Sequence, residues 1–329
     1  MSKIAEILRA YPPDCQPTAV ESIGNAGGMS GAQFWRFVAP RGTLALRCWP
    51  IEHPSPERLE FIHAVLRHAA DRGLRFLSVP IATTTGATFV RQDGRLWELA
   101  PWLPGTADYE QAPRAEKLRA AMIALADLHI AVRDFPRPPA PGSAGGAPAI
   151  THRLARLIEL QNGGIDELAR AITDDRWPEL APRARQFVTE FCRVAPIAIR
   201  QLTPLADQPF RVQLCIRDIW HDHILFTGDA VTGIIDFGAV DFDTPATDVA
   251  RLLGSLIGDN SSGWDEGIRA YSSICVLTDS EAHAIPLLDV AGTLLAGCNW
   301  IRWIHVEGRE FDAPPTIISR FNRILRRII

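Results

Sequence analysis

The sequence predicts an α+β fold with a small β-rich N-lobe and a larger helical C-lobe. Short alternating apolar segments, typical of strands, are concentrated in the first hundred residues, and long amphipathic helical patterns dominate the remainder. The chain has 329 residues and is 47% hydrophobic, which suffices for a substantial core in one bilobal unit or two domains. We place the boundary at a proline-rich bend, so that the N-lobe covers 1–102 and the C-lobe covers 103–329.

The composition argues against a nucleic-acid or membrane partner. The formal net charge is −4, so no basic surface argues for a nucleic-acid partner. We find neither a signal peptide nor an apolar run of transmembrane length, and therefore expect a soluble cytoplasmic protein without a membrane partner. The oligomeric state stays open. The six cysteines lack metal-type spacing and are predicted to be reduced core thiols: Cys15, Cys48, Cys192, Cys215, Cys275 and Cys298.

The N-lobe begins with a short helix over 2–11 that two prolines end. Strands are predicted over 20–23 and 33–39, joined by the glycine-rich turn 24–31, where backbone N–H groups can approach a ligand closely. A third strand over 43–49 carries a single cation, Arg47.

A helix is predicted over 54–73, where Gly73 ends it. A hairpin follows, with strands at 88–91 and 95–102 around the turn dipeptide Asp93-Gly94. The C-lobe then shows a proline- and glycine-rich connection at 136–149 and a series of amphipathic helices. Their predicted ranges are 116–132, 150–172, 177–199, 264–276, 281–306 and 315–328.

Residues 211–238 carry the chemistry. Two apolar strand-like runs, 212–216 and 231–237, each lead to an acidic residue, Asp218 and Asp236, and His223 lies between them. Phosphoryl transfer needs a carboxylate near the acceptor hydroxyl and metal-ligating side chains that face the phosphates. Asp218 would then lie where the hydroxyl proton leaves, while His223 and Asp236 would converge on a divalent metal, with Asp222 as an alternative oxygen ligand in place of His223.

This stretch resembles the aminoglycoside phosphotransferase family, small-molecule kinases with a protein-kinase-like fold that include choline and homoserine kinases. The family pattern is roughly His-Gly-Asp, four residues, Asn, and then an Ile-Asp-Phe/Trp segment. Asp218 matches its Asp, Arg217 stands in the place of its Gly, and His223 stands in the place of its Asn. Asp248 matches a family carboxylate that fixes the catalytic loop, and the sequence around His129 is similar to a family helix that braces this loop.

The resemblance implies a protein-kinase-like fold, ATP with Mg²⁺ or Mn²⁺, and a small-molecule acceptor phosphorylated on a hydroxyl. In that interpretation Asp218 is the catalytic base, Asp236 and His223 hold the metal, and Arg217, Asp248 and His129 support the loop. Nucleotide contacts are expected from the glycine-rich turn, the third-strand cation, a helix glutamate that the resemblance pairs with this cation, and the bend between the lobes. The residues concerned are Gly27, Gly28, Ser30, Gly31, Arg47, Glu60, Glu98 and Ala100, although Glu57 and His63 are alternatives to Glu60.

Two other functions remain open. The pattern lacks the family's His and Asn and has no third-strand lysine, so a non-catalytic nucleotide-binding relative is the main alternative. A metal-dependent hydrolase is the other, because His221 and His223 would share a face on an extended segment.

Four tryptophans provide weaker evidence for an acceptor site. Trp300 and Trp303 share a helix face, and with Trp220 and Trp264 they could form an aromatic wall for a sugar or a cationic acceptor. An ordinary aromatic core is the alternative that we favour, because aromatic residues at helical spacing are commonly packing residues.

Overall fold

The structure is a computed structural model that describes residues 3–17, 19–24, 31–137, 146–175, 177–311 and 314–329. It divides the chain into two compact units. The first unit comprises Met1–Phe135 and His221–Val240, and the second comprises Pro136–Trp220 and Asp241–Ile329. The compact units thus divide after Phe135 rather than after residue 102, and the N-lobe boundary at 102 stays a prediction.

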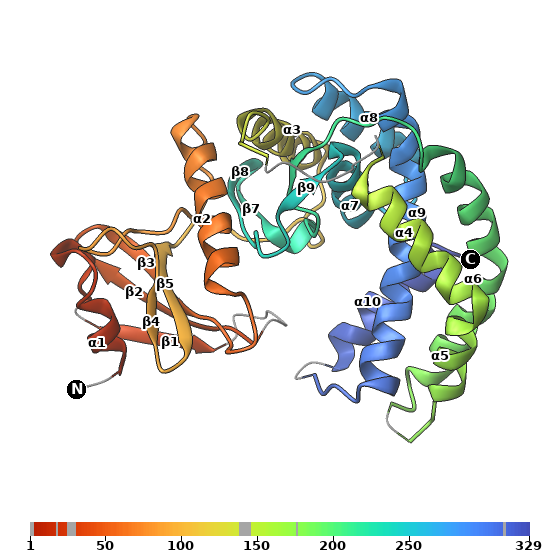
Figure 1. Cartoon of the computed structure of the whole chain (residues 1–329), viewed down its shortest axis with the longest axis horizontal. Helices are drawn as coiled ribbons and strands as arrows, with labels where there is room; N and C mark the ends of the chain where they lie inside the picture. Colours follow the sequence, from red (N-terminus) through yellow and green to blue (C-terminus); the bar gives the residue numbers. More distant parts are fainter. Residues whose placement is uncertain (1–2, 18, 25–30, 138–145, 176, 312–313) are drawn as a thin grey trace. The chain divides into compact units, whose positions relative to one another are not determined.

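The first unit contains a five-stranded antiparallel sheet with the strand order β1-β2-β3-β5-β4 (Figure 1). The strands follow the predicted alternation, and the β4–β5 turn has left-handed backbone at Asp93 and Gly94, as a tight hairpin requires. The strands are β1 (Val20–Gly24), β2 (Gln33–Ala39), β3 (Gly42–Cys48), β4 (Val90–Gln92) and β5 (Arg95–Pro101).

The two faces of this sheet pack against different helices. Helix α1 (Lys3–Leu8) and the turn after it cover one face, where Ile7 and Tyr11 join a buried cluster with Leu46 and Leu99. Helix α2 (Pro56–Asp71) begins at the cap Ser55, and its Leu59 packs on the other face. Because side chains alternate along a strand, Arg47 on β3 and Glu98 on β5 lie on the α2 face.

The hairpin β7 (Ile224–Thr227) and β8 (Ala230–Ile234) belongs to the first unit, together with α3 (Ala115–Ala131) and the turn η4 (His221–His223). It packs on the segment after β5, where backbone hydrogen bonds join Thr106 and Phe226 in both directions. Gly105 is required there, because a Cβ atom would lie 2.4 Å from Thr232 Oγ1 and 2.7 Å from the Phe226 carbonyl oxygen.

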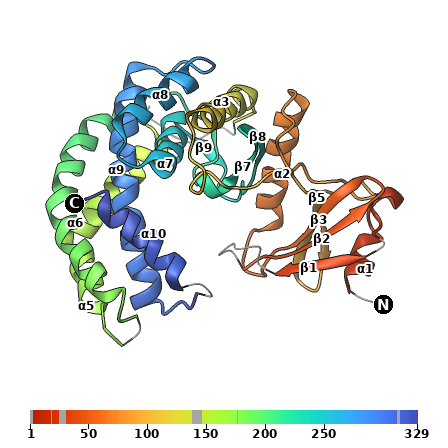
Figure 2. The ribbon, with the colours of Figure 1, turned by 180° about the vertical axis from the view of Figure 1, so that it is seen from behind.

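The second unit is mainly helical. Helix α9 runs through its middle and packs against α4, α6, α7 and α10 (Figure 2). A two-stranded sheet of β6 and β9 pairs Gln213 with Asp243 and Cys215 with Asp241. The elements are α4 (Pro148–Glu159), η2 (Leu160–Gly164), α5 (Ile165–Ala171), α6 (Ala181–Leu202), η3 (Thr203–Leu205), β6 (Gln213–Cys215), β9 (Asp241–Asp243), α7 (Pro245–Ile257), α8 (Ser261–Ser272), α9 (Asp279–Ile301), η5 (Arg302–Val306) and α10 (Pro314–Arg326); a short turn η1 (Pro13–Cys15) lies in the first unit.

The structure departs from three sequence predictions. The helix predicted over 150–172 is broken into α4 and α5, because Gly163 has a φ of 123° that a helix cannot contain. Cys192 is exposed, whereas the other five cysteines are buried as predicted. Contrary to the prediction that no apolar run has transmembrane length, Asp279–Val306 is long and apolar enough to cross a membrane by length and composition, but 56% of its most apolar window is buried inside the protein.

Candidate active site

The first unit presents a half-buried ion pair on the α2 face of its sheet. Arg47 and Glu98 are direct cross-strand partners, with Arg47 Nη1 3.8 Å from Glu98 Oε1. Their side chains are only 17% and 12% exposed. The guanidinium of Arg47 also lies against two aromatic rings, 3.3 Å from the Trp49 centroid and 5.1 Å from that of Phe34. The position and orientation of the third-strand cation are therefore fixed by packing as well as by charge.

Helix α2 contributes His63, not Glu60 or Glu57, to this ion pair. His63 Nε2 lies 2.7 Å from Glu98 Oε2, and its Nδ1 lies 2.7 Å from Thr88 Oγ1. A carboxylate can only accept, so the Nε2–H of His63 donates to Glu98. Glu60 is exposed, because its place on the helix turns it away from the face that carries Leu59 and His63. The expected pairing of Glu60 with Arg47 is thus not formed. Arg47 on β3 is instead linked through Glu98 on β5 to His63 on α2.

Neighbouring groups shift the pKa values of both Arg47 and Glu98. Burial lowers the pKa of Arg47, and the negative charges of Glu98 and Asp236 oppose that effect. Burial alone would raise the pKa of Glu98, but the hydrogen bond from His63 and the charge of Arg47 outweigh it, so the pKa of Glu98 is lowered. Glu98 is therefore ionised at neutral pH and supplies a permanent counter-ion for Arg47.

Asp236 lies just beyond β8, in a left-handed backbone conformation with a φ of 64°. Non-glycine residues rarely adopt this conformation, and such strain is concentrated at functional sites. Arg58, in the first turn of α2, donates hydrogen bonds to the carbonyl oxygens of Gly238 and Val240, which anchors the segment after Asp236. The Asp236 side chain is 49% exposed and can reach a ligand.

His223 and Asp236 form a pair of donor atoms suited to a divalent cation. His223 Nε2 lies 3.7 Å from Asp236 Oδ2. Two ligand atoms that are each roughly 2.1 Å from one ion can be separated by about 3.0 to 4.2 Å, so both can bind the same ion. Phosphate oxygens and water commonly complete such a site. The two residues therefore fit the predicted metal.

The pairing of His221 with His223 that a hydrolase would need is not formed. Residues 221–223 make a tight helical turn, η4, rather than an extended segment, so alternate side chains do not share a face. His221 is buried, with Nε2 3.2 Å from Glu110 Oε1 and Nδ1 2.9 Å from Asp222 Oδ1. Asp222 is thereby held by His221, and His223 faces Asp236 instead.

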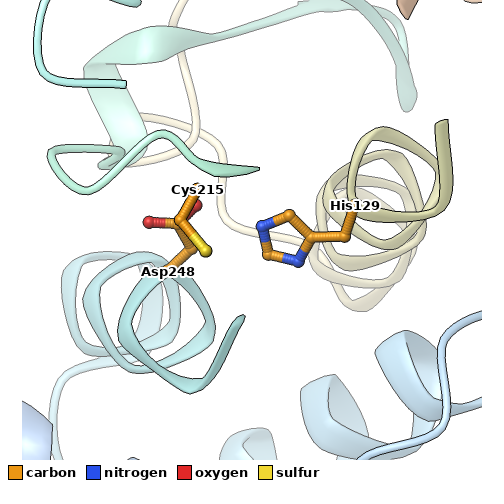
Figure 3. A group of neighbouring side chains, drawn as sticks. All are labelled: His129, Cys215 and Asp248. Carbon is orange, nitrogen blue, oxygen red and sulfur yellow. The ribbon is translucent and has the colours of Figure 1, made fainter. Parts of the chain in front are cut away.

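In the second unit, Asp248 fixes the loop that presents Asp218. Its buried carboxylate accepts hydrogen bonds from the backbone N–H groups of Ile216 and Arg217, at 2.6 and 2.7 Å. Figure 3 shows Asp248, from α7, beside Cys215, from β6. Burial, followed by the charges of Asp248 and Asp243, raises the pKa of the Cys215 thiol. The thiol therefore stays protonated beside the two carboxylates.

Arg217 is also in a left-handed conformation, with a φ of 68°. This conformation lets its guanidinium reach back to the β9 strand, 3.5 Å from Asp241 Oδ2 and 3.6 Å from Asp243 Oδ2. Asp243 is fully buried and also accepts from the N–H groups of Ala149 and Thr244. Burial raises the pKa of Asp243, although these hydrogen bonds oppose the shift. The loop before Asp218 is therefore held in two ways, by its backbone N–H groups on Asp248 and by the side chain of Arg217 on β9.

Arg251 contacts Asp218 directly, a contact that sequence analysis missed. Its Nη2 donates to Asp218 Oδ1 at 3.2 Å, and the Asp218 side chain is 62% exposed. Arg251 follows Asp248 by one turn of α7, so one helix face supplies both a loop clamp and a partner for Asp218. That i, i+3 spacing was the one available indication in the sequence.

The remaining predicted residues are distributed as follows. Gly27, Gly28 and Ser30 lie outside the described residues, Gly31 has a φ of 74°, and Ala100 pairs with Ala45 in the sheet. His129 is buried in α3 of the first unit.

The tryptophans have separate environments. Trp300 is buried and packs edge-on against Trp303 at 5.1 Å, and Trp264 Nε1 donates to the Gly258 carbonyl oxygen at 2.8 Å. Trp220 instead lies near Arg251 and Arg320.

With this geometry in view, the family can be assigned. The model of the phosphotransferase enzyme family matches residues 23–284, which include β3, α2 and the whole segment from Asp218 to Asp248. The chain belongs to the phosphotransferase enzyme family. The match confirms the predicted family and enzyme class, and it makes the hydrolase alternative untenable.

Relatives and solved structures agree with this assignment. A homoserine kinase of Rhizobium meliloti (strain 1021) is 28% identical over 274 residues, covering 80% of this chain and 74% of the relative. Spectinomycin phosphotransferase in complex with ADP and spectinomycin superposes with a TM-score of 0.67 at 11% identity, covering 99% of this chain and 96% of that one. An amicoumacin kinase in complex with AMP-PNP and Ca²⁺ gives 0.65 at 13% identity, covering 98% and 90%. These likenesses confirm the predicted kinase-like fold.

Proposed function

We propose that this phosphotransferase moves the γ-phosphoryl group of ATP to a hydroxyl of a small molecule, with Asp218 as the base or acceptor-orienting group. The observation that carries the proposal is the clamp on the Asp218 loop, where buried Asp248 accepts from two consecutive backbone N–H groups. Phosphoryl transfer depends mostly on positioning and charge neutralisation, so a rigidly held, exposed carboxylate is what this chemistry requires. The relative from Rhizobium meliloti, a homoserine kinase, supports a hydroxyl acceptor.

The first unit supplies the groups for the nucleotide. Arg47 contacts the phosphates, with Glu98 and His63 holding it in place, and Gly27, Gly28, Ser30 and Gly31 provide backbone N–H groups for the same anion. The segment 98–104, including Ala100, holds the adenine. Two solved neighbours, one with AMP-PNP and Ca²⁺ and one with ADP, support ATP with a divalent metal as the cofactors.

Asp236 and His223 hold the metal in this proposal. When bound, the ion neutralises charge on the phosphate oxygens, Mg²⁺ or Mn²⁺ being the predicted species. Asp218 accepts the proton of the acceptor hydroxyl, while Arg217, Asp248 and His129 act as positioning residues. The protein is further proposed to act in the cytoplasm on a free small molecule, for which amino alcohols, sugars and aminoglycoside-like compounds are the predicted classes.

The experiment is acceptor-dependent ADP release by the purified full chain and by Asp218→Asn. Loss of a general base typically lowers kcat by roughly two to four orders of magnitude, while ATP binding measured by calorimetry should stay nearly unchanged. Asp265→Asn, an exposed acid on α8, is the matched control and should behave as wild type. Equal kcat values for wild type and Asp218→Asn would remove Asp218 from the reaction, and ATP binding without any turnover would favour a non-catalytic relative.

A further inference from the structure

Trp220 is flanked by two guanidinium groups from different helices. Arg320, on α10, has its Cζ 4.3 Å from the centre of the indole ring, and Arg251, on α7, has its Cζ at 6.0 Å. All three residues belong to the second unit, as does Asp218. A ring that already contacts two protein cations is a poor wall for a cationic acceptor, because a third positive charge would be repelled.

The same arrangement suits an anion. A guanidinium carries its N–H donors in its own plane. Arg251 has five such donors and uses one for Asp218 Oδ1. A planar guanidinium matches a carboxylate, which it can bind through two parallel hydrogen bonds.

Several charges lie close together here. Burial lowers the pKa of Arg153; the charges of Asp243 and Asp248 oppose that shift, while the charges of Arg251 and Arg217 add to it. Asp241 and Asp243 offset the charge of Arg217. Arginines from α4, α7 and α10 therefore contribute positive charge to the part of the unit that holds Asp218, which is exposed.

We propose that the acceptor is a carboxylate-bearing hydroxy compound, such as a hydroxy amino acid, whose carboxylate is bound by Arg251 and Arg320 at Trp220 while its hydroxyl is presented to Asp218. This inference rests on the proposed phosphotransferase function and specifies its substrate class. It assigns Arg320 a role in specificity, because Arg320 approaches the Trp220 indole more closely than Arg251 does.

The test compares acceptors that differ in the carboxylate. L-Homoserine and 3-aminopropan-1-ol carry the same primary hydroxyl and an amine, but only homoserine has a carboxylate; kanamycin represents polycationic acceptors. With the full chain and Mg·ATP, we expect kcat/KM for homoserine to exceed that for 3-aminopropan-1-ol by at least about a hundredfold, since sites built to hydrogen-bond a polar group strongly reject analogues that lack it.

Variants of α10 separate recognition from folding. Arg320→Gln should raise the KM for homoserine roughly tenfold to a hundredfold, the loss expected for hydrogen bonds to a charged group, and leave the KM for ATP unchanged. Arg320→Lys keeps the charge but cannot donate two parallel hydrogen bonds, so its KM for homoserine should lie between those of wild type and Arg320→Gln. Arg326→Gln, the same substitution at an exposed position in the last turn of α10, is the control and should match wild type.

The outcomes distinguish this inference from the function on which it rests. Turnover of kanamycin or 3-aminopropan-1-ol at rates equal to or above those of homoserine would overturn the carboxylate site and leave the phosphotransferase function standing. A homoserine KM that is the same in Arg320→Gln and wild type would also overturn it. ADP release that none of the three acceptors stimulates would count against both proposals.

Discussion

Replacing Glu98 by glutamine tests whether Glu98 on β5, rather than Glu60 on α2, holds Arg47 in place. The substitution keeps the size of the side chain, and its amide oxygen can still accept from His63 Nε2, which lies 2.7 Å from Glu98 Oε2 in the native protein. What it removes is the negative charge beside Arg47. Because Arg47 is only 17% exposed, its charge would then lack a close counter-ion on the sheet.

The magnitude follows from this geometry. Removing one partner of a buried ion pair typically costs about 3–5 kcal/mol. The effect should be smaller here, about 2–3 kcal/mol, because the Arg47 Nη1 to Glu98 Oε1 distance is a long 3.8 Å and Asp236 also attracts the guanidinium. If Arg47 contacts phosphate, the loss of the carboxylate that holds it should raise the KM for ATP roughly tenfold, equivalent to about 1.4 kcal/mol.

Urea unfolding and the KM for ATP measure the two effects separately. Glu60→Gln is the control, since Glu60 is exposed on α2 and should affect neither quantity. His63→Gln keeps the Arg47–Glu98 pair and should cost less stability than Glu98→Gln. If Glu60→Gln raised the KM for ATP while Glu98→Gln left both quantities unchanged, Glu60 and not Glu98 would be the partner of Arg47.

Three further predictions concern the loop clamp, the metal and a buried acid. Asp248→Asn should cost about 2–3 kcal/mol and lower kcat more than it raises the KM for ATP, because one of the two loop N–H groups loses its acceptor; an unchanged urea midpoint would contradict this. Wild type should turn over with Mn²⁺ at least as well as with Mg²⁺, and His223→Asn should shift the ratio of initial rates toward Mg²⁺, because magnesium prefers oxygen to imidazole nitrogen; an unaltered ratio would exclude His223 as a ligand. Burial raises the pKa of Asp289 to about 6. The native protein therefore holds this proton more tightly than the unfolded chain, and the free energy of unfolding should fall by about 2 kcal/mol as pH rises from 4 to 6. Asp289→Asn should remove that loss. Parallel pH profiles of urea unfolding for the two proteins would show that another group is responsible.

The elements were predictable where local pattern decides them. Alternation predicted the strands of the N-terminal sheet, and the spacing of apolar residues predicted α2, α3 and α6 to within a few residues. The Asp93-Gly94 turn needed only two residues to be recognised. By contrast, the break between α4 and α5 at Gly163 escaped prediction, because a glycine is tolerated within a helix until its own φ is known.

The side-chain partners were predictable only where they follow from a fixed spacing. Asp248 could be expected near the Asp218 loop because it matches a family position. The partnership of Arg47 with Glu98 depends on the register of β3 against β5, which sequence alone does not specify, and His63 reaches Glu98 only because of how α2 packs on that face. Arg320 lies on the last helix of the described chain, a hundred residues after Trp220, so no local spacing could predict that the two are neighbours.

Arg217 shows why a departure from the family pattern need not abolish function. The family that this chain resembles places glycine there, and the structure gives a reason, since the φ of 68° is free for glycine and costs another residue roughly 1–2 kcal/mol. The arginine, unlike a glycine, reaches Asp241 and fully buried Asp243, at 3.5 and 3.6 Å. Without this cation the Asp243 carboxylate, whose pKa burial already raises, would be harder to ionise. Arg217 therefore adopts a left-handed turn at a position where the family pattern has glycine, and it adds a side-chain tether between the Asp218 loop and β9.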